Sequence, residues 1–505
     1  MTRVLLDTNV LIHREAAVVV RPDIGKLFYW LDKLGYAKCV HPVSLEEIEK
    51  HDDKRVRNSF RAKLQSYHEL KTTAPLAEQV AAVCAADRTE NDRNDTLLVN
   101  ELYANRVGYL ISEDRGVQEK ALKLGIPERA FSIEGFLEKV TAENPDLVDY
   151  KVLAVKRQHF GDTDIGSSFF DSFRADYGEG AFDAWFNKKA DETAYVCYEA
   201  ELLEAFLYLK LEGPDENYSD IAPRFSPKRR LKIGTFKVEL NGFKLGERFL
   251  KIVFDNALRQ RVDEVYVTIF PRSLEQLRLI RLLEDFGFVR HGAKANPFGA
   301  EDVYTRDMTP SVSLQDPKQT FPYASRSSRP FLVPIYPEYH TTLLPDSILK
   351  TESPADFVEQ EPHRNAIRKV YVSRSINRDL HRGDIIVFYR TGGYHRAVVT
   401  TLGIVEDCHT EIKSEDEFLQ LCRKRSVFSD DELRAHWRYS RNSVPFIVDF
   451  LYAYSFPRRP NMKELIDNDV IHDVQSAPRG FERITQDQLE TILSLSRSDT
   501  SIVVD

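Results

Sequence analysis

The first 145 residues alternate short apolar runs with stretches in which apolar residues recur every three or four positions. Short apolar runs bounded by polar residues predict strands, and the three-to-four spacing predicts amphipathic helices. Their alternation is typical of a parallel sheet covered by helices. We expect strands at Val4–Asp7, Lys38–Val43 and Val107–Ser112, and helices at Ser44–His51 and Asp95–Ala104.

The pattern changes after residue 150. Between 150 and 308, strand-like runs are mixed with a long amphipathic helix, LGERFLKIVFDNALRQ, which predicts a second α/β domain. Residues 309–330 are rich in proline and serine, which predicts a linker or an extended strap. Several short strands at close spacing predict a small β-barrel with helices over 331–505. The predicted fold class is therefore α/β multidomain, with domains at 1–145, 150–308 and 331–505.

Composition narrows the class of protein. A chain of 505 residues corresponds to about three domains of ordinary size. Its net charge of −9 excludes a surface coated for indiscriminate nucleic-acid binding, so any such contact must be local. No run approaches the ~20 apolar residues that span a membrane, and Asp7 and Asn9 interrupt the first apolar run, unlike a signal peptide. We expect a cytoplasmic protein with no membrane partner.

Four acidic residues follow or adjoin the predicted strands of the first domain, namely Asp7, Glu47, Asp95 and Asp114. The carboxyl ends of parallel strands share one edge of a sheet, so these side chains could converge there. Clustered carboxylates repel one another unless a cation lies between them. Oxygen ligands suit Mg²⁺ or Mn²⁺, which activate water for attack on a phosphodiester. The set predicts hydrolytic cleavage of a nucleic acid.

Each of these residues also has a purely structural interpretation. Glu47 lies three positions after Ser44, the spacing of a helix capping box. Asp95 could be a helix N-cap, and Asp114 could be an ordinary turn residue. Glu46 competes with Glu47 as the second acid, and Glu47 is preferred because it directly precedes Ile48.

The same residues carry a resemblance. VLLDTNVLI, SLEEIEKH, NDRNDTLLVNELY and LISEDRGVQEKALKLGI resemble the four motifs of the PIN domain nucleases over nearly all of residues 1–145. The resemblance implies a Mg²⁺- or Mn²⁺-dependent ribonuclease. In it the carboxylate set would be Asp7, Glu47, Asp95 and Asp114, supported by Asp92, Thr8, Asn9 and Ser112.

The second domain contains a strand, TFKVEL, and a loop that opens the long helix. Such a junction presents free N–H groups and the positive helix end to an anion. With the strand VYVTIF and the stretch LIRLLEDFGFVRHG, it resembles the GNAT acetyltransferases over 150–308. That resemblance implies acetyl-CoA bound by the loop residues Leu240, Asn241, Gly242, Lys244, Leu245 and Gly246.

Two features depart from the GNAT pattern. The family's Arg or Gln and its first Gly correspond to Asn241 and Lys244, so only Gly246 is kept. Leu283 occupies the position where many members have a tyrosine that protonates the leaving thiolate, and leucine cannot donate a proton. Either another group serves as the acid, with Tyr266 and Tyr208 as candidates that nothing in the sequence selects, or the domain is an inactive scaffold that still binds a CoA-like ligand. The basic run SPKRRLK (226–232) is either a solvated loop or a phosphate contact.

In the third domain, RGDIIVFYRTGGYHRAVVTTLGIVED predicts a hairpin. It resembles the paired strands of ASCH and EVE domains, which are PUA-like barrels associated with RNA. Basic and aromatic residues alternate around it, a pattern suited to phosphate contact and base stacking but also found on solvated strands. The candidate RNA-binding residues are Arg374, Tyr389, Arg390 and His395.

Together these features predict an RNA-acting protein, with tRNA or mRNA as the substrate of the nuclease. By analogy with other PIN and GNAT proteins, a toxin or defence role, an antitoxin partner and a homodimer are expected. In the alternative interpretation, acetyl transfer is the main activity and the other domains are binding platforms. A third interpretation is a non-enzymatic scaffold that senses CoA and binds RNA.

Overall fold

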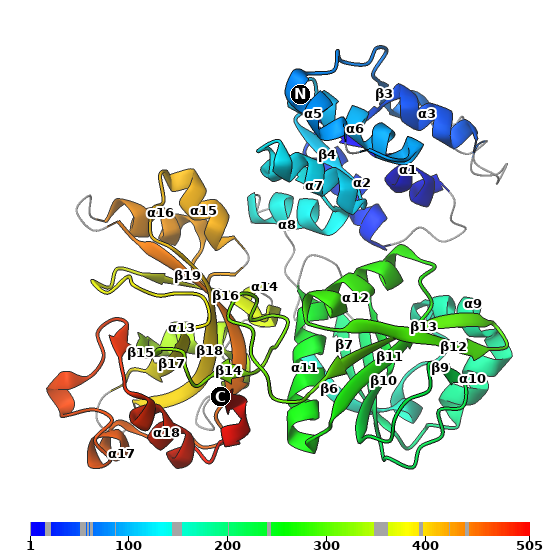
Figure 1. The fold of residues 1–505 in the computed structure, drawn as a ribbon. Helices are drawn as coiled ribbons and strands as arrows, with labels where there is room; N and C mark the ends of the chain where they lie inside the picture. Colours follow the sequence, from blue (N-terminus) through cyan, green and yellow to red (C-terminus); the bar gives the residue numbers. More distant parts are fainter. Residues whose placement is uncertain are drawn as a thin grey trace. The chain divides into compact units, whose positions relative to one another are not determined.

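The computed structural model describes residues 2–15, 22–50, 57, 60, 64–85, 87–143, 154–199, 201–239, 244–347, 362–392, 397–423, 425–439 and 444–505 (Figure 1). Two compact units are present. One lies within residues 1–149, and the other holds nearly all of the described chain beyond them. The first predicted boundary thus falls between the units. The predicted second and third domains lie together in the second unit, so the division into three domains stays a prediction.

The first unit is built on a parallel five-stranded sheet, as predicted, with the order β3-β2-β1-β4-β5. Helices lie between successive strands, as parallel pairing requires. The strands are β1 (Arg3–Leu6), β2 (Ala37–Val40), β3 (His68–Glu69), β4 (Tyr109–Ile111) and β5 (Ala130–Phe131). The helices are α1 (Thr8–Glu15), α2 (Pro22–Lys33), α3 (Pro42–Glu49), α5 (Glu78–Cys84), α6 (Glu90–Tyr103), α7 (Arg115–Lys123) and α8 (Ile133–Glu143).

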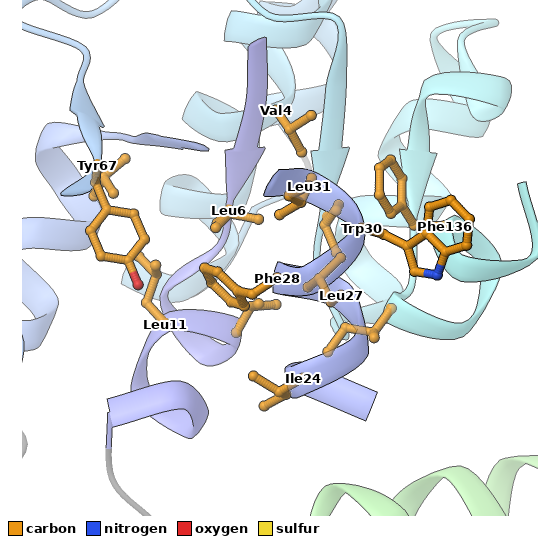
Figure 2. Packing of buried hydrophobic residues seen from close by; sticks show 14 of the residues in the cluster. Val4, Leu6, Leu11, Ile24, Leu27, Phe28, Trp30, Leu31, Tyr67 and Phe136 are labelled. Atoms are coloured by element: carbon orange, nitrogen blue, oxygen red, sulfur yellow. The ribbon is translucent and has the colours of Figure 1, made fainter. Parts of the chain in front are cut away.

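Helix α2 provides much of the core of this unit. Its apolar face presents Leu27, Phe28 and Leu31 towards Leu6 of β1, and Phe136 of α8 closes the cluster (Figure 2). All of these side chains are buried. This buried layer packs against one face of the sheet and stabilises it.

The second unit contains an eight-stranded sheet with the order β6-β7-β8-β10-β11-β13-β12-β9. All its neighbouring strands are antiparallel except β10 and β11, which are parallel and joined through α11. The order strand, helix, strand, helix is the one that the sequence predicts for this region. The strands are β6 (Ala154–His159), β7 (Thr193–Glu199), β8 (Leu202–Glu212), β9 (Ile221–Ala222), β10 (Arg230–Val238), β11 (Glu264–Ile269), β12 (Val289–Asn296) and β13 (Gly299–Asp307). The helices are α9 (Asp171–Tyr177), α10 (Glu179–Asn187), α11 (Leu245–Gln260) and α12 (Leu274–Asp285).

The proline- and serine-rich segment is a packed strap. It is irregular, as predicted, apart from β14 (Ala324–Ser325), which pairs with β21 (Val503–Val504). Phe321 is fully buried, and its ring lies 5.2 Å from that of Phe254 and 5.6 Å from that of Phe286. The strap therefore belongs to the core of the unit.

The C-terminal segment forms a six-stranded sheet with the order β16-β19-β18-β17-β15-β20. The two strands of the predicted hairpin are present, at Ile385–Arg390 and Val398–His409. Over the described residues the end strands β16 and β20 are not paired with each other, so the sheet is open where a small barrel was predicted. The strands are β15 (Pro330–Ile335), β16 (Arg368–Ser373), β17 (Ile385–Arg390), β18 (Val398–His409), β19 (Phe446–Ser455) and β20 (Glu482–Arg483). The helices are α13 (Pro337–Leu343), α14 (Pro362–Asn365), α15 (Glu415–Cys422), α16 (Asp430–Arg438), α17 (Met462–Asp467) and α18 (Gln486–Leu495).

Polar contacts join α11 to this C-terminal segment within the second unit. The Arg248 guanidinium lies 2.6 Å from a carboxylate oxygen of Asp346. The carboxylate of Glu247 accepts the backbone N–H of Ile367 at 2.9 Å. The predicted α/β multidomain class is confirmed, and none of the described helices is long and apolar enough to cross a membrane.

Replacing Leu31 by alanine should destabilise the first unit by about 2–5 kcal/mol, because Leu31 is fully buried and the cavity would not be refilled. Leu122→Ala is the matched control, since Leu122 is 65% exposed. Calorimetry of both variants checks this, and equal melting temperatures would contradict the packing described.

Candidate functional site

Asp7 lies between the end of β1 and the start of α1, at the carboxyl edge of the parallel sheet. It is 6% exposed. Its carboxylate accepts hydrogen bonds from the Ser112 hydroxyl at 2.6 Å, the Thr8 backbone N–H at 2.6 Å and the Asn9 amide at 2.9 Å. Thr8, Asn9 and Ser112 therefore orient Asp7, as the sequence predicts for supporting residues.

Glu47 joins Asp7 through Thr8. Its carboxylate accepts hydrogen bonds from the Thr8 hydroxyl and, at 2.5 Å, from the amide of Asn94 on α6. The competing residue, Glu46, is exposed. The capping-box alternative for Glu47 is wrong, because the N-cap of α3 is His41, whose ring accepts the Val43 N–H.

Asp95 and Asp114 meet beside Gly116. A β-carbon built on Gly116 would lie 3.1 Å from Asp114 Oδ1 and 3.2 Å from Asp95 Oδ2. Asp95 lies inside α6 and is not its N-cap. Asp114 does cap α7, where it accepts the Gly116 N–H at 2.6 Å, so the structural interpretation of this residue holds beside the proposed one.

Asp92 caps the N-terminus of α6. It was predicted to support the carboxylate cluster, and its hydrogen bonds go to the helix N-terminus instead. Its carboxylate accepts the N–H groups of Arg88 and Thr89, and the Thr89 hydroxyl accepts the Asp92 N–H, which is a complete capping box. These bonds hold the pKa of Asp92 below its usual range. Helix α6 consequently begins five residues before the predicted start, at Glu90.

The electrostatics show that the four carboxylates share one neighbourhood. Burial, followed by the charges of Asp114 and Asp7, raises the pKa of Asp95 to about 8. Burial also raises the pKa of Asp7 to about 6, with Glu47 and Asp114 contributing and the Ser112 bond opposing. Such repulsion is relieved by a proton or a cation.

The donor set suits a hard divalent cation. It consists of carboxylate oxygens, and the carbonyl oxygen of the Asn9 amide is buried without a hydrogen-bond donor beside Asp7. Within the part of the chain that the structure describes, however, no three His, Cys, Asp or Glu side chains form a closed ligand group. The four carboxylates concentrate negative charge that a cation would neutralise. Their oxygens do not by themselves form a complete coordination sphere.

Two further residues of this site were missed by the sequence prediction. Asn94 holds Glu47, and its position directly before Asp95 was the available signal. The Lys120 ammonium donates to the Asp92 carbonyl, lies 3.0 Å from Asp87 and opposes the rise in the pKa of Asp95. In the sequence, Lys120 is one more lysine of an amphipathic helix.

The parallel pair β10–β11 forms the second candidate site. The two strands pair only as far as Ile233 and Val267, although β10 continues to Val238 beside β8. A bulge at Gly234 starts this divergence, and a β-carbon there would lie 2.6 Å from the Tyr208 ring. The two strands are therefore no longer paired at their carboxyl ends, and from β10 the chain leads on to α11.

Three of the six predicted loop residues are described. Leu240, Asn241 and Gly242 lie outside the described residues. Lys244 is the N-cap of α11 and has φ 56°, the left-handed conformation that glycine adopts freely, so the backbone keeps a glycine-like turn. Leu245 is buried, and a β-carbon on Gly246 would lie 3.2 Å from Leu282, so both can offer only backbone groups to a ligand.

Neither tyrosine considered from the sequence is free to serve as the missing general acid. Leu283 is fully buried. The Tyr266 hydroxyl donates to Glu212 at 2.7 Å, and burial with that carboxylate raises the pKa of Tyr266. Tyr208 accepts the Lys189 ammonium at 3.0 Å and packs in the core. The structure therefore disfavours both Tyr266 and Tyr208 as the general acid.

The predicted RNA-binding residues differ in how far they are exposed to solvent. Tyr389 is 2% exposed, and burial raises its pKa to about 12, so the predicted stacking of its ring on a base is incorrect. Arg390 is partly buried, and His395 lies outside the described residues. Arg374 lies 5.0 Å from the ring centre of Tyr439, which is 81% exposed. This pair keeps the predicted combination of charge and aromatic surface.

The chain was compared with family models, with curated proteins and with solved structures. No family model and no curated protein matches the chain. Solved structures do match. The NatC complex bound to Gag peptide and CoA has 15% identity and a TM-score of 0.21 over 31% of this chain and 99% of its own. A polyamine N-acetyltransferase of Drosophila melanogaster has 15% identity and a TM-score of 0.23 over the same shares. Aminoglycoside acetyltransferase AAC(6')-Ib, in complex with coenzyme A and kanamycin, has 13% identity and a TM-score of 0.23 over 31% and 94%.

Two of these proteins are acetyltransferases by name, and the first is a complex bound to CoA. At such identities no substrate and no catalytic residue passes from them to this chain.

Stability of the first unit should depend on pH through Asp95. Its carboxyl group is protonated more readily in the folded state, so its contribution is full below pH 4 and is lost as pH rises towards 8. Asp95→Asn should therefore melt higher than the wild type at pH 8, by about 2–4 °C for each kcal/mol of repulsion relieved. The difference should close near pH 4.

Differential scanning calorimetry between pH 4 and pH 8 measures this effect. Glu46→Gln is the control, because Glu46 is exposed and should change nothing. Parallel curves for Asp95→Asn and the wild type would show that Asp95 is not repelled by its neighbours.

Proposed function

We propose that the first unit is a metal-dependent ribonuclease that hydrolyses phosphodiester bonds at Asp7, Glu47, Asp95 and Asp114. The observation that supports this proposal is the convergence of four acidic side chains at one edge of a parallel sheet, two of them with strongly raised pKa values. The PIN-like motifs of the sequence agree with the proposal.

The protein's own residues would prepare the site. Ser112 and Asn9 hold the Asp7 carboxylate, while Thr8 and Asn94 hold that of Glu47. These bonds fix the direction of the oxygens before any ligand arrives, which lowers the cost of ordering them. A bound Mg²⁺ or Mn²⁺ would supply an activated water and offset the charge of the phosphate.

The biological setting is also a proposal. The expected substrate is tRNA or mRNA in the cytoplasm, and the expected role is that of a toxin or defence effector with an antitoxin partner or a homodimeric state. This setting is supported only by the analogy with PIN and GNAT proteins.

Asp7→Asn and Asp114→Asn should each reduce cleavage of total cellular RNA by at least 100-fold in the presence of Mn²⁺, because a metal-binding carboxylate is lost while the packing is kept. Gel analysis with wild type, both variants and an EDTA lane checks this. Glu46→Gln should cut at the wild-type rate, because Glu46 is exposed. Equal cleavage by wild type and both Asp variants would refute the carboxylate assignment.

A second candidate function is acetyl-CoA-dependent acetyl transfer by the middle of the chain. The specific observation that favours it is that the parallel pairing of β10 and β11 stops at Ile233 and Val267, while β10 continues to Val238 and the chain then leads to the N-terminus of α11. The proton donor would have to be a group other than Leu283, Tyr266 or Tyr208. Binding without transfer is the corresponding scaffold alternative.

Lys244→Glu should weaken acetyl-CoA binding about tenfold or more, because it places a second carboxylate beside Glu247 where the pyrophosphate would lie. Arg259→Glu is the matched control, since Arg259 lies in the last turn of the same helix. Isothermal titration of the full chain measures both. If the wild type binds no acetyl-CoA, the second function is excluded, whatever the outcome of the RNA experiment.

A further inference from the structure

Lys232 is a lysine without an acidic partner on the sheet of the second unit. It lies on β10 opposite Tyr266 of β11, and its ammonium is 5.6 Å from the centre of the Tyr266 ring. The side chain is partly buried. Among the described residues, no carboxylate oxygen lies within 4.0 Å of it, and no hydrogen bond to its ammonium is present.

The cations around Lys232 are all paired. Its neighbour on the same face of β10, Arg230, lies 2.6 Å from Glu264. Lys210, opposite Lys232 on β8, lies 2.8 Å from Glu212. Lys294 lies 3.2 Å from Asp220. Pairing is therefore the rule on this face, and Lys232 departs from it.

The nearby acids are already occupied by other donors. Glu212 accepts the hydroxyls of Tyr218 and Tyr266 in addition to the Lys210 ammonium. Glu301 accepts hydrogen bonds from Tyr177, from Thr268 at 3.1 Å and from Asn296 at 2.9 Å. Neither acid turns an oxygen to Lys232 at bonding distance.

The charge of Lys232 is consequently costly in the free protein. Burial, followed by the charge of Lys294, lowers the pKa of Lys232. An unpaired cation removed from water destabilises a fold unless an anion comes to it. The charges of Lys294 and Lys210 add to this cost, and those of Glu212 and Glu301 oppose it without forming an ion pair with Lys232.

We propose that Lys232, assisted by Lys294, binds the oxyanion of a small molecule, a carboxylate or a phosphate, on this face of the sheet. The site adjoins the region where β10 and β11 part after Ile233 and Val267. The proposal goes beyond both proposed functions and depends on neither. If the domain transfers acetyl groups, the acceptor carries this anionic group and Lys232 selects it.

The test uses the full chain in an amine-buffered chloride solution free of oxyanions. Calorimetry follows the melting of the second unit while inorganic phosphate or glutarate is added. The variants are Lys232→Met and Lys156→Met. Lys156 is a matched control because it is exposed on the edge strand β6, so its loss removes the same charge from the same sheet.

Wild type and Lys156→Met should show a saturable rise in melting temperature with one or both probes, and Lys232→Met should require at least tenfold more probe. A response to phosphate alone assigns a phosphate, and a response to glutarate alone assigns a carboxylate. Without a probe, Lys232→Met should melt at or above the wild-type temperature, because an unpaired charge is removed.

Two results would overturn the proposal. One is a Lys232→Met response equal to that of the wild type, or no saturable response to either probe. The other is a lower melting temperature of Lys232→Met in the absence of anions, which would show that the ammonium is already satisfied within the fold.

Discussion

Repulsion between clustered carboxylates is the constraint on which the first unit depends. Parallel strands end at a common edge, and this chain places acids on the loop and helices at that edge. The rest of the unit is organised so that the repulsion is tolerated. Hydroxyl and amide donors from Thr8, Asn9, Asn94 and Ser112 hold the oxygens, and the buried layer beneath α2 prevents the strands from moving apart. Local strain of this kind is common at sites that bind a ligand.

In the second unit, the buried charges of α11 are neutralised by ion pairs. Where its two halves meet, α11 pairs Arg248 with Asp346 and binds backbone groups of the C-terminal segment through Glu247. Burial and the Arg248 charge have opposing effects on Asp346, and the pairing holds the pKa of that carboxyl far below its usual range. Buried ion pairs contribute little net stability but penalise any arrangement that separates them. They therefore specify how the two halves dock.

The two candidate sites share a physical logic. Each lies where parallel strands end, since that is where backbone groups are unpaired and side chains can converge. In the first unit the convergence is of carboxylates, which suits a cation. In the second, the pairing of β10 and β11 ends before β10 does, and lysines lie on the adjoining strands, so an anion is the ligand proposed there. Charge sign thus separates the chemistry of two otherwise similar edges.

Periodicity and chain order determined much of this protein. The alternating pattern predicted the parallel sheet, because strands buried on both faces and amphipathic helices leave strong local signals. The position of Asp7 at the end of the first strand marked the site for the same reason. The preference for Glu47 over Glu46 was likewise readable from the neighbouring Ile48, which faces the core.

Only the tertiary structure decided which partners each polar group found. His41 and Thr89, rather than Ser44 and Asp95, begin their helices, because a cap depends on backbone angles that neighbouring elements impose. Tyr389 is buried because β17 is covered on both faces, which an alternating sequence does not reveal. Lys232 looks like any lysine of a basic run. Its lack of a partner follows from strand register, which places every nearby acid against another donor.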